Sequence, residues 1–189
     1  MNNLLKINPD KEEKKIISFI KETLDKQKII RGVIGVSGGV DSAASLFLLS
    51  KAISLENISA LYLPYFDSST DDLDEMISSV GLQDNQLFNI PIEEMVDAIS
   101  DELEVPDEDH IRKGNIMARI RMIVLYDFAK KNNALVVGTE NRSEYHLGYF
   151  TRFGDGASDI EPIQHLYKTQ VYELAKHLNL PQSIINKTP

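Results

Sequence analysis

The segment 37–42, Ser-Gly-Gly-Val-Asp-Ser, contains the residue types needed to hold a phosphate. It follows a short apolar run, residues 32–36, and precedes a second apolar run with helical spacing. Its two glycines let the backbone approach an anion closely, and the free N–H groups at the start of the next helix attract that anion. Its two serines add hydroxyl donors. We therefore interpret 37–42 as an anion-binding loop.

Asp41 is the one acidic residue of this loop, and alone it would repel a phosphate. A carboxylate beside phosphates suits a Mg²⁺ ion that bridges the two. The alternative is an ordinary Gly-Gly turn in which Asp41 and Ser42 begin a helix. Six suitable residues in a row between a strand and a helix favour the anion site. The chain lacks both G-x-x-x-x-G-K-[ST] and G-x-G-x-x-G, so the loop is of neither common nucleotide-binding type.

The elements that must position this loop alternate between strands and helices. We predict strands over 32–36, 58–64, 86–92 and 133–139, and helices over 10–27, 42–53, 68–82, 93–103, 115–131 and 167–180. This alternation predicts an α/β fold with a doubly wound, mostly parallel sheet flanked by helices. Ligands of such folds bind beyond the carboxyl ends of the strands, where the strand order switches. We expect the site where 37–42 meets 138–144.

The length and composition fit one domain over residues 1–189. A hydrophobic content of 42% and a charged content of 26% are typical of a soluble globular protein. No uncharged run approaches the roughly 18 residues that cross a bilayer, and the start of the chain lacks the apolar core of a signal peptide. We expect a cytoplasmic protein with no membrane partner.

The absence of cysteine excludes disulfides, thiolate zinc sites and a cysteine nucleophile from this chain. The net charge of −9 disfavours nucleic acid as the main partner, because binders of nucleic acid usually carry a basic face. A small anionic substrate remains compatible, since one local group of basic side chains can hold it.

The sequence "SGGVDS" resembles the signature of the N-type ATP pyrophosphatases, which cleave ATP between the α and β phosphates. The segments "KGNIMARIRMIVLYDFA", "VVGTENRSEYHLGYFTRFGDGASDIEPI" and "LYKTQVYELAKHL" resemble the NAD synthetase family within that group. The resemblance runs from about residue 30 to the end of the chain. It implies a Rossmann-like fold of the adenine nucleotide alpha hydrolase type.

The resemblance also implies the site residues. ATP would be bound by Ser37, Gly38, Gly39, Val40, Asp41, Ser42, Thr139 and Lys168. Mg²⁺ would be held by Asp41 and Glu144, deamido-NAD would be bound by Arg119, Arg152 and Asp159, and Asp41 and Lys168 would be the catalytic residues. Family members usually have Lys where this chain has Arg152. The arginine keeps the positive charge but not the geometry of that lysine.

Some of these residues also allow structural interpretations. Lys168 begins a predicted helix, where a cation opposes the helix dipole, and a nearby phosphate would explain its place. Arg119 lies on a largely apolar helix and needs an anion, which could be the substrate or a carboxylate such as Asp127 or Glu140.

Aromatic residues and histidines near these motifs have side chains that could contact a ligand or a metal. Tyr149, Phe150 and Phe153 offer ring faces to a pyridine or adenine, but we expect at least one of them in the core. The histidines His110, His146, His165 and His177 have no metal-ligand spacing, and we interpret them as solvent-facing or hydrogen-bonded locally.

The implied reaction is that of a ligase that forms a C–N bond. ATP would adenylate the carboxylate of deamido-NAD with release of pyrophosphate, and ammonia would displace AMP to give NAD. Glutamine-using relatives carry a glutaminase domain with a cysteine nucleophile, so a chain without cysteine should use free ammonia or receive it from a separate subunit. The family also implies a homodimer, for which the apolar helix 115–131 is a candidate interface.

Two alternatives remain open from the sequence. One is another N-type ATP pyrophosphatase, and the other is a regulatory protein that binds an adenine nucleotide but has impaired catalysis. The chain ends at "NKTP", where the family implies a further C-terminal segment with a second phosphate-contacting loop, and this argues for the second alternative. The presence of Asp41, Glu144 and Lys168 argues against it, so NAD synthetase is the leading interpretation.

Overall fold

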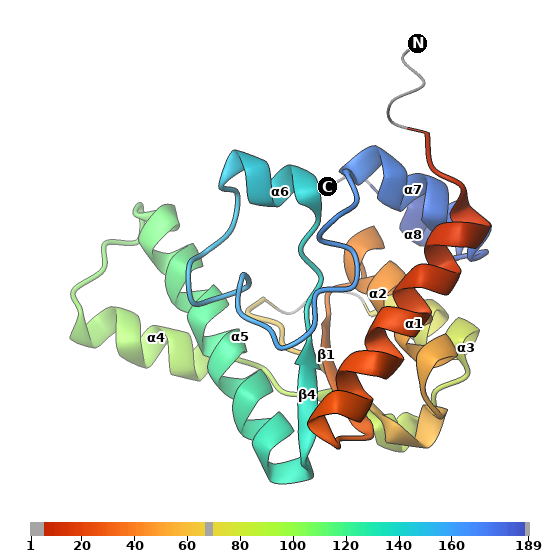
Figure 1. The fold of residues 1–189 in the computed structure, drawn as a ribbon. Coiled ribbons are helices and arrows are strands. Elements are labelled where there is room, and N and C mark those ends of the chain that lie inside the picture. Colours follow the sequence, from red (N-terminus) through yellow and green to blue (C-terminus); the bar gives the residue numbers. More distant parts are fainter. Residues whose placement is uncertain (1–5, 67–69, 188–189) are drawn as a thin grey trace.

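The computed structural model describes residues 6–66 and 70–187 as a parallel sheet between two layers of helices (Figure 1). The strands are β1 (Arg31–Val36), β2 (Ile58–Tyr62), β3 (Leu87–Asn89) and β4 (Ala134–Val137). The α-helices are α1 (Pro9–Gln27), α2 (Val40–Ala52), α3 (Asp71–Val80), α4 (Glu93–Glu102), α5 (His110–Asn132), α6 (Arg142–Leu147), α7 (Lys168–His177) and α8 (Gln182–Asn186). Short 3₁₀ helices, Leu55–Asn57 and Asp84–Gln86, precede β2 and β3. Among the described helices, none is both long and apolar enough to cross a bilayer.

The sheet has the strand order β3-β2-β1-β4, and all its strand pairs are parallel. The chain moves outward from β1 to β2 and β3, then returns to place β4 on the other side of β1. The strand order therefore switches between β1 and β4, where ligands of such folds bind. The predicted doubly wound α/β fold is confirmed.

Each face of the sheet carries its own hydrophobic core. On one face, α1, α2 and α7 pack around residues such as Ile20, Ile34 and Leu174. On the other face, α4 and α5 cover Val33, Leu61 and their neighbours. Figure 1 shows these two helix layers on opposite sides of β1 and β4. The elements that follow β1 and β4 are thus held from both sides.

Helix α2 is buried on almost all sides. Ten of its thirteen residues are buried, and α1, α3, α7 and α8 contact it in addition to the sheet. A helix that is hydrophobic all round is expected only inside a protein. Because α2 starts directly after the 37–42 loop, its burial fixes the end of that loop.

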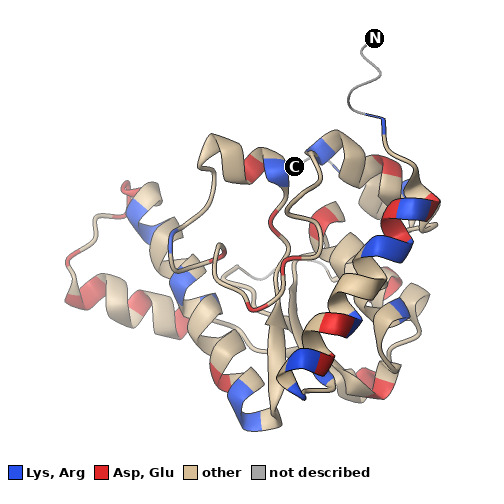
Figure 2. Cartoon of the chain, in the orientation of Figure 1, with Lys and Arg blue, Asp and Glu red and all other residues tan. Residues whose placement is uncertain are grey.

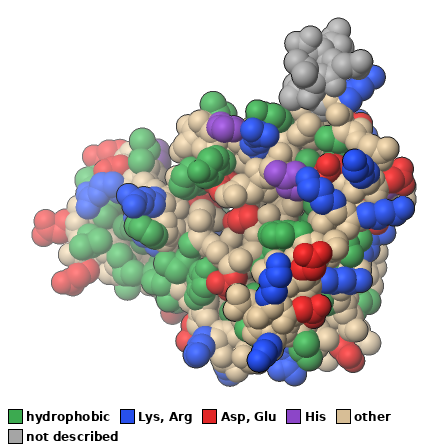
Figure 3. Space-filling model, viewed as in Figure 1, with side chains coloured by type: hydrophobic (Ala, Val, Ile, Leu, Met, Phe, Trp, Pro, Cys, Tyr) green, Lys and Arg blue, Asp and Glu red, His purple; other side chains and the backbone are tan. Residues whose placement is uncertain are grey.

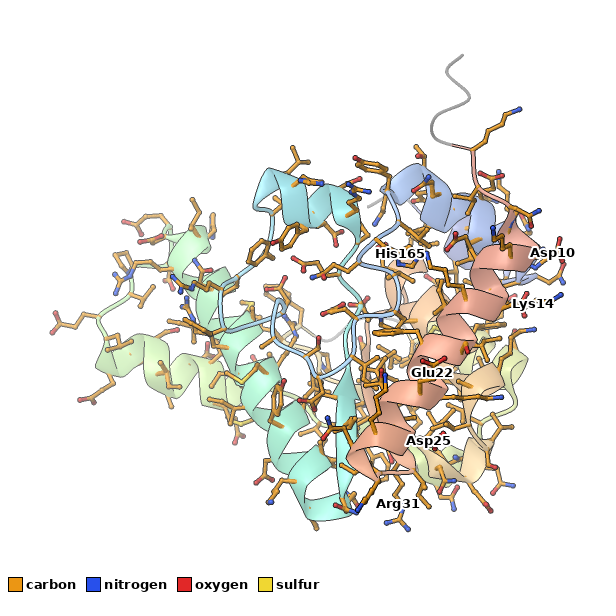
Figure 4. The ribbon with its side chains drawn as sticks, viewed as in Figure 1. Asp10, Lys14, Glu22, Asp25, Arg31 and His165 are labelled. Atoms are coloured by element: carbon orange, nitrogen blue, oxygen red, sulfur yellow. The ribbon has the colours of Figure 1, made fainter. Side chains whose placement is uncertain are left out.

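Two histidines join α1 to the C-terminal half of the chain. His165 Nε2 lies 3.0 Å from Glu12 Oε2, and His177 Nε2 lies 2.7 Å from Glu13 Oε2. Figure 4 shows His165 beside the N-terminal half of α1, and Figure 2 shows the charged residues along this helix. Both histidines have hydrogen-bond partners, as expected, but these are more than 150 residues away and not local.

Several predicted boundaries were wrong. β1 ends at Val36 as predicted, but β2, β3 and β4 are shorter than predicted at their C-terminal ends, because the chain there leaves the sheet to form loops. Helix α2 begins at Val40, two residues earlier than predicted, and α6 was not predicted. The first two residues of the helix predicted over 68–82 lie outside the described residues, and the described Thr70 makes no side-chain cap to the backbone.

The helix predicted over 115–131 extends over His110–Asn132 and is less buried than expected. Ile123 is 54% exposed, because only one side of α5 faces the sheet. The expectation that one of three aromatic residues lies in the core was also wrong. Tyr149, Phe150 and Phe153 are 80%, 36% and 65% exposed, because they follow α6 on a loop outside the two helix layers.

Candidate active site

The 37–42 loop is closed by its own hydroxyl groups. The Ser37 and Ser42 Oγ atoms lie 3.2 Å apart, and the Gly39 N–H donates to Ser37 Oγ at 3.3 Å. Gly38 has φ of 72°, a conformation that favours glycine. Gly39 is the N-cap of α2 and receives no side-chain cap, so the first N–H groups of this buried helix open toward the loop.

Three charged side chains meet beside this loop. Lys168 Nζ forms a short ion pair with Asp41 Oδ2 and lies 3.7 Å from Glu144 Oε1. The Lys168 backbone N–H donates to Ser143 Oγ at 3.1 Å, which fixes the start of α7 beside α6. The structure therefore brings together three residues that are distant in sequence and come from the elements after β1 and β4.

Asn141, which was not predicted as a site residue, connects these groups. Its Nδ2 donates to Asp41 Oδ1 at 3.1 Å, while its Oδ1 accepts from the N–H groups of Ser143 and Glu144 at 2.9 and 3.2 Å. Glu144 Oε2 accepts in turn from the Asn141 N–H at 3.2 Å, which completes a capping box at the start of α6. The pattern Asn-x-x-Glu is the sequence signal that could have located both α6 and Asn141.

The charges at this site shift each other's titration. Burial opposes the charge of Lys168, but the hydrogen bond and charge of Asp41, helped by Glu144, hold the pKa of Lys168 above its ordinary value. Burial is the largest influence on Glu144, and with the nearby charge of Asp41 it raises the pKa of Glu144. A further cation beside both carboxylates would relieve this repulsion.

The two carboxylates suit a metal that is shared with a substrate. Asp41 and Glu144 approach the same ammonium group, so both can reach one point near the loop. No group of three or more potential ligands (His, Cys, Asp or Glu) occurs in the described ranges. Mg²⁺ is commonly bound by one or two carboxylates together with substrate phosphates, and this donor set fits such an ion.

A cavity of about 990 Å³ opens from the loop toward α5. Its wall includes Ser37, Thr139, Arg121, Tyr149 and Phe150. Thr139 thus lies at the cavity, as its predicted contact with ATP requires. The predicted dinucleotide ligands Arg119 and Arg152 do not belong to the described wall.

The three predicted dinucleotide ligands already contact the chain itself. Arg119 Nη2 lies 3.4 Å from the Arg152 carbonyl oxygen and forms no ion pair with the carboxylates suggested from the sequence. The Arg152 guanidinium lies over the Phe153 ring at 4.8 Å. Asp159 Oδ2 accepts from the Val136 N–H at 2.8 Å and thereby makes a hydrogen bond to the edge of β4. A ligand at Asp159 would have to share that carboxylate with the sheet.

A second pair of carboxylates, those of Glu140 and Glu161, lies in the segment that follows β4. A side chain at Gly138 would clash with the Glu161 carboxylate, 2.1 Å from its Oε1, so only glycine fits there. Glu161 accepts from Ser158 Oγ at 2.5 Å and from the Glu140 N–H at 3.3 Å. Burial, with the charges of Glu140 and Glu144, raises the pKa of Glu161 to about 7. No local sequence pattern predicts this pair.

Lys187 also lies at the loop, near Gly38. Its Nζ forms a 2.7 Å ion pair with Asp72 and would be 3.5 Å from a side chain placed on Gly38. Lys187 is the lysine of the C-terminal sequence "NKTP", whose last two residues lie outside the described ranges. The loop therefore has two lysine side chains beside it, Lys168 at Asp41 and Lys187 at Gly38.

A parallel sheet with a glycine-rich loop, two carboxylates and lysines at its switch point defines a nucleotide-binding α/β enzyme. The family model of NAD synthase matches residues 12–189. The chain belongs to the NAD synthase family.

Individual relatives agree with this assignment. The NH(3)-dependent NAD(+) synthetase of Thermoplasma volcanium is 45% identical over 184 residues, which cover 95% of this chain and 72% of the relative. The solved NH3-dependent NAD synthetase of Campylobacter jejuni is 36% identical, with a TM-score of 0.89 over 96% of this chain and 78% of that one. The NMN synthetase of Francisella tularensis is 33% identical, with a TM-score of 0.87 over 97% of this chain and 76% of that one.

Proposed function

We propose that this chain is an ammonia-dependent NAD synthetase that amidates deamido-NAD with consumption of ATP. The observation that carries the proposal is the convergence of Asp41, Glu144 and Lys168 on the 37–42 loop, in a chain that belongs to the NAD synthase family. ATP would bind at the loop, and the presence of Thr139 in the adjoining cavity wall supports this.

Asp41 and Glu144 would hold Mg²⁺. When bound, this ion would neutralise charge on the phosphates and orient them for displacement. Lys168, which pairs with both carboxylates, would then bind a phosphate oxygen from α7. Asn141 keeps Asp41 in place through its amide and needs no movement to do so.

The chain contributes mainly position and charge. The carboxylate oxygen of deamido-NAD attacks the α phosphorus, and the bond to the bridging oxygen breaks as pyrophosphate leaves. The N–H groups at the start of α2 and Lys168 stabilise the negative charge on the phosphates. Ammonia then attacks the acyl carbon and AMP leaves, with loss of a proton from the nitrogen. We assign Arg119, Arg152 and Asp159 to the dinucleotide.

The test is an NAD-formation assay on the 189-residue chain. With ATP, Mg²⁺, deamido-NAD and ammonium, we expect one AMP for each NAD. Glutamine should not replace ammonium, because the chain has no cysteine. Deamidated NMN is the matched control substrate, since a similar solved protein is an NMN synthetase. Preference for that mononucleotide, or ATP consumption without amide formation, would contradict the proposal.

We further propose that the enzyme is a homodimer that associates through α5, α6 and the loop after α6. Large hydrophobic side chains gather there (Figure 3), and Ile111, Ile123 and Leu147 are 79%, 54% and 81% exposed. Exposed apolar surface of this kind marks an interaction site. It adjoins the cavity, whose wall includes Ile111 and Tyr149.

Sedimentation velocity at micromolar concentration tests this arrangement. Ile123→Asp should convert a dimer to a monomer, because a charge on an apolar interface is desolvated without a partner. Ile30→Asp, at an even more exposed residue just before β1, should leave the dimer intact. A monomeric wild-type chain, or an Ile123→Asp dimer, would refute it.

A further inference from the structure

Arg121 is a half-buried cation in the cavity wall, and no carboxylate of the described residues pairs with it. Its Nε donates to the Leu63 carbonyl oxygen at 3.0 Å. No carboxylate in the described ranges lies within ion-pair distance of its guanidinium, and no acceptor there binds its Nη1 or Nη2. Burial lowers the pKa of Arg121, and the more distant charge of Asp155 offsets this only in part. A buried cation in this setting is costly unless an anion joins it.

The register of the sheet places this cation beside the 37–42 loop. Val36 of β1 pairs with Tyr62 of β2, so Ser37 and Leu63 are the first residues to leave these two adjacent strands at the same end of the sheet. Adjacent strands lie about 4.8 Å apart. The Leu63 carbonyl that holds Arg121 is therefore next to the first residue of the loop, and both residues line the cavity.

Arg121 and Lys168 approach the loop from opposite faces of the sheet. Arg121 belongs to α5, which packs on the face with Val33 and Leu61. Lys168 begins α7, which packs with α2 on the other face. A phosphate at the start of α2 would thus have a fixed cation on each side. The terminal nitrogens of Arg121 form a planar fork that matches the oxygens of a phosphate.

We propose that Arg121 binds a phosphate of ATP from the α5 side of the 37–42 loop. This inference rests on the proposed ATP-dependent function. The chemistry that Arg121 recognises, a pair of anionic oxygens, is also offered by the carboxylate of deamido-NAD. Its position beside Ser37, the first residue of the loop, favours the phosphate.

Binding measured without turnover distinguishes these two ligands. We would titrate the full chain with α,β-methylene-ATP and Mg²⁺, and separately with deamido-NAD, in a calorimeter. Arg121→Met removes the charge and keeps the length of the side chain, while Arg121→Lys keeps the charge without the fork. Arg112→Met is the matched control, because Arg112 lies on the same helix but outside the described cavity wall.

Arg121→Met should weaken binding of the ATP analogue by about tenfold to a hundredfold, the usual effect of losing a charged hydrogen bond. Its binding of deamido-NAD should change less than about twofold, Arg121→Lys should be intermediate, and Arg112→Met should match the wild type. Weakened binding of deamido-NAD alone, or of both ligands equally, would overturn the proposal, as would no change in either.

Circular dichroism melting shows whether Arg121→Met folds. If it does not, Arg121→Lys decides: a loss of about fivefold or more in analogue affinity supports the proposal, and an unchanged affinity overturns it. A wild-type chain that binds the analogue but makes no NAD would count against the proposed function and would leave this result standing.

Discussion

Asp41→Asn should lower kcat/KM for NAD formation about a thousandfold while the protein stays folded. The variant keeps the shape of the side chain and an oxygen that can accept from Asn141. It loses the charge that pairs with Lys168 and that would hold Mg²⁺. Losses of this size follow from removing one electrostatic contact at a reacting phosphate together with metal binding. The partly exposed ion pair itself contributes less than about 1 kcal/mol to stability.

The measurement is steady-state NAD formation over a range of Mg²⁺ concentrations, with thermal melting in parallel. Asp25→Asn is the control, because it makes the same chemical change near the end of α1, away from the described cavity wall (Figure 4). Activity within tenfold of wild type at all Mg²⁺ concentrations would show that Asp41 is not a metal ligand in this reaction.

Glu161→Gln should stabilise the protein by about 3 kcal/mol at pH 8 and have little effect at pH 4.5. The pKa of Glu161 is about 7 in the folded chain and has a reference value of 4.5. Between these values the folded state binds a proton that the unfolded state has lost, so wild-type stability falls as pH rises through this window. Glutamine stays neutral and avoids that loss. It can keep both contacts of Glu161, since the Ser158 hydroxyl can accept as well as donate.

Urea unfolding at pH 4.5, 6 and 8 measures this effect. The difference between the variant and the wild type should grow with pH and level off above pH 7. Glu102→Gln, at an exposed residue of α4, should show no such trend. A Glu161→Gln variant that is less stable at pH 8 would mean that Glu161 is charged in the folded protein and stabilises it.

The layered fold could be predicted because its strands and helices carry strong local patterns. Continuous apolar runs identified the buried strands, and an apolar stripe of Ile16, Phe19, Ile20 and Leu24 identified α1, although Phe19 is exposed in the structure. The short helix α6 was missed because five or six residues show no periodicity, although its capping box was present in the sequence. At least one of Tyr149, Phe150 and Phe153 was expected in the core, and this was wrong because hydrophobicity alone does not distinguish a core from an exposed apolar surface.

The candidate site could be predicted in part. The motif around Asp41, and the resemblance that pointed to Glu144 and Lys168, named residues that the structure brings together, while their roles stay predictions. Arg121 and Glu161 could not be found in this way. Each depends on contacts across the fold, with a strand-end carbonyl in one case and with Gly138 in the other. The spacing of residues in the sequence does not reveal contacts of this kind.

The burial of α2 has a consequence for how this enzyme can evolve. A helix with almost no free surface cannot accept a change of side-chain volume without moving, and the 37–42 loop is covalently joined to its first turn. Substitutions that alter the packing of α2 should therefore impair catalysis even when they lie far from the substrate. Neutral variation should collect on α1 and α4, whose outer faces are open to solvent, and adaptation to other substrates should proceed through the loops around α6.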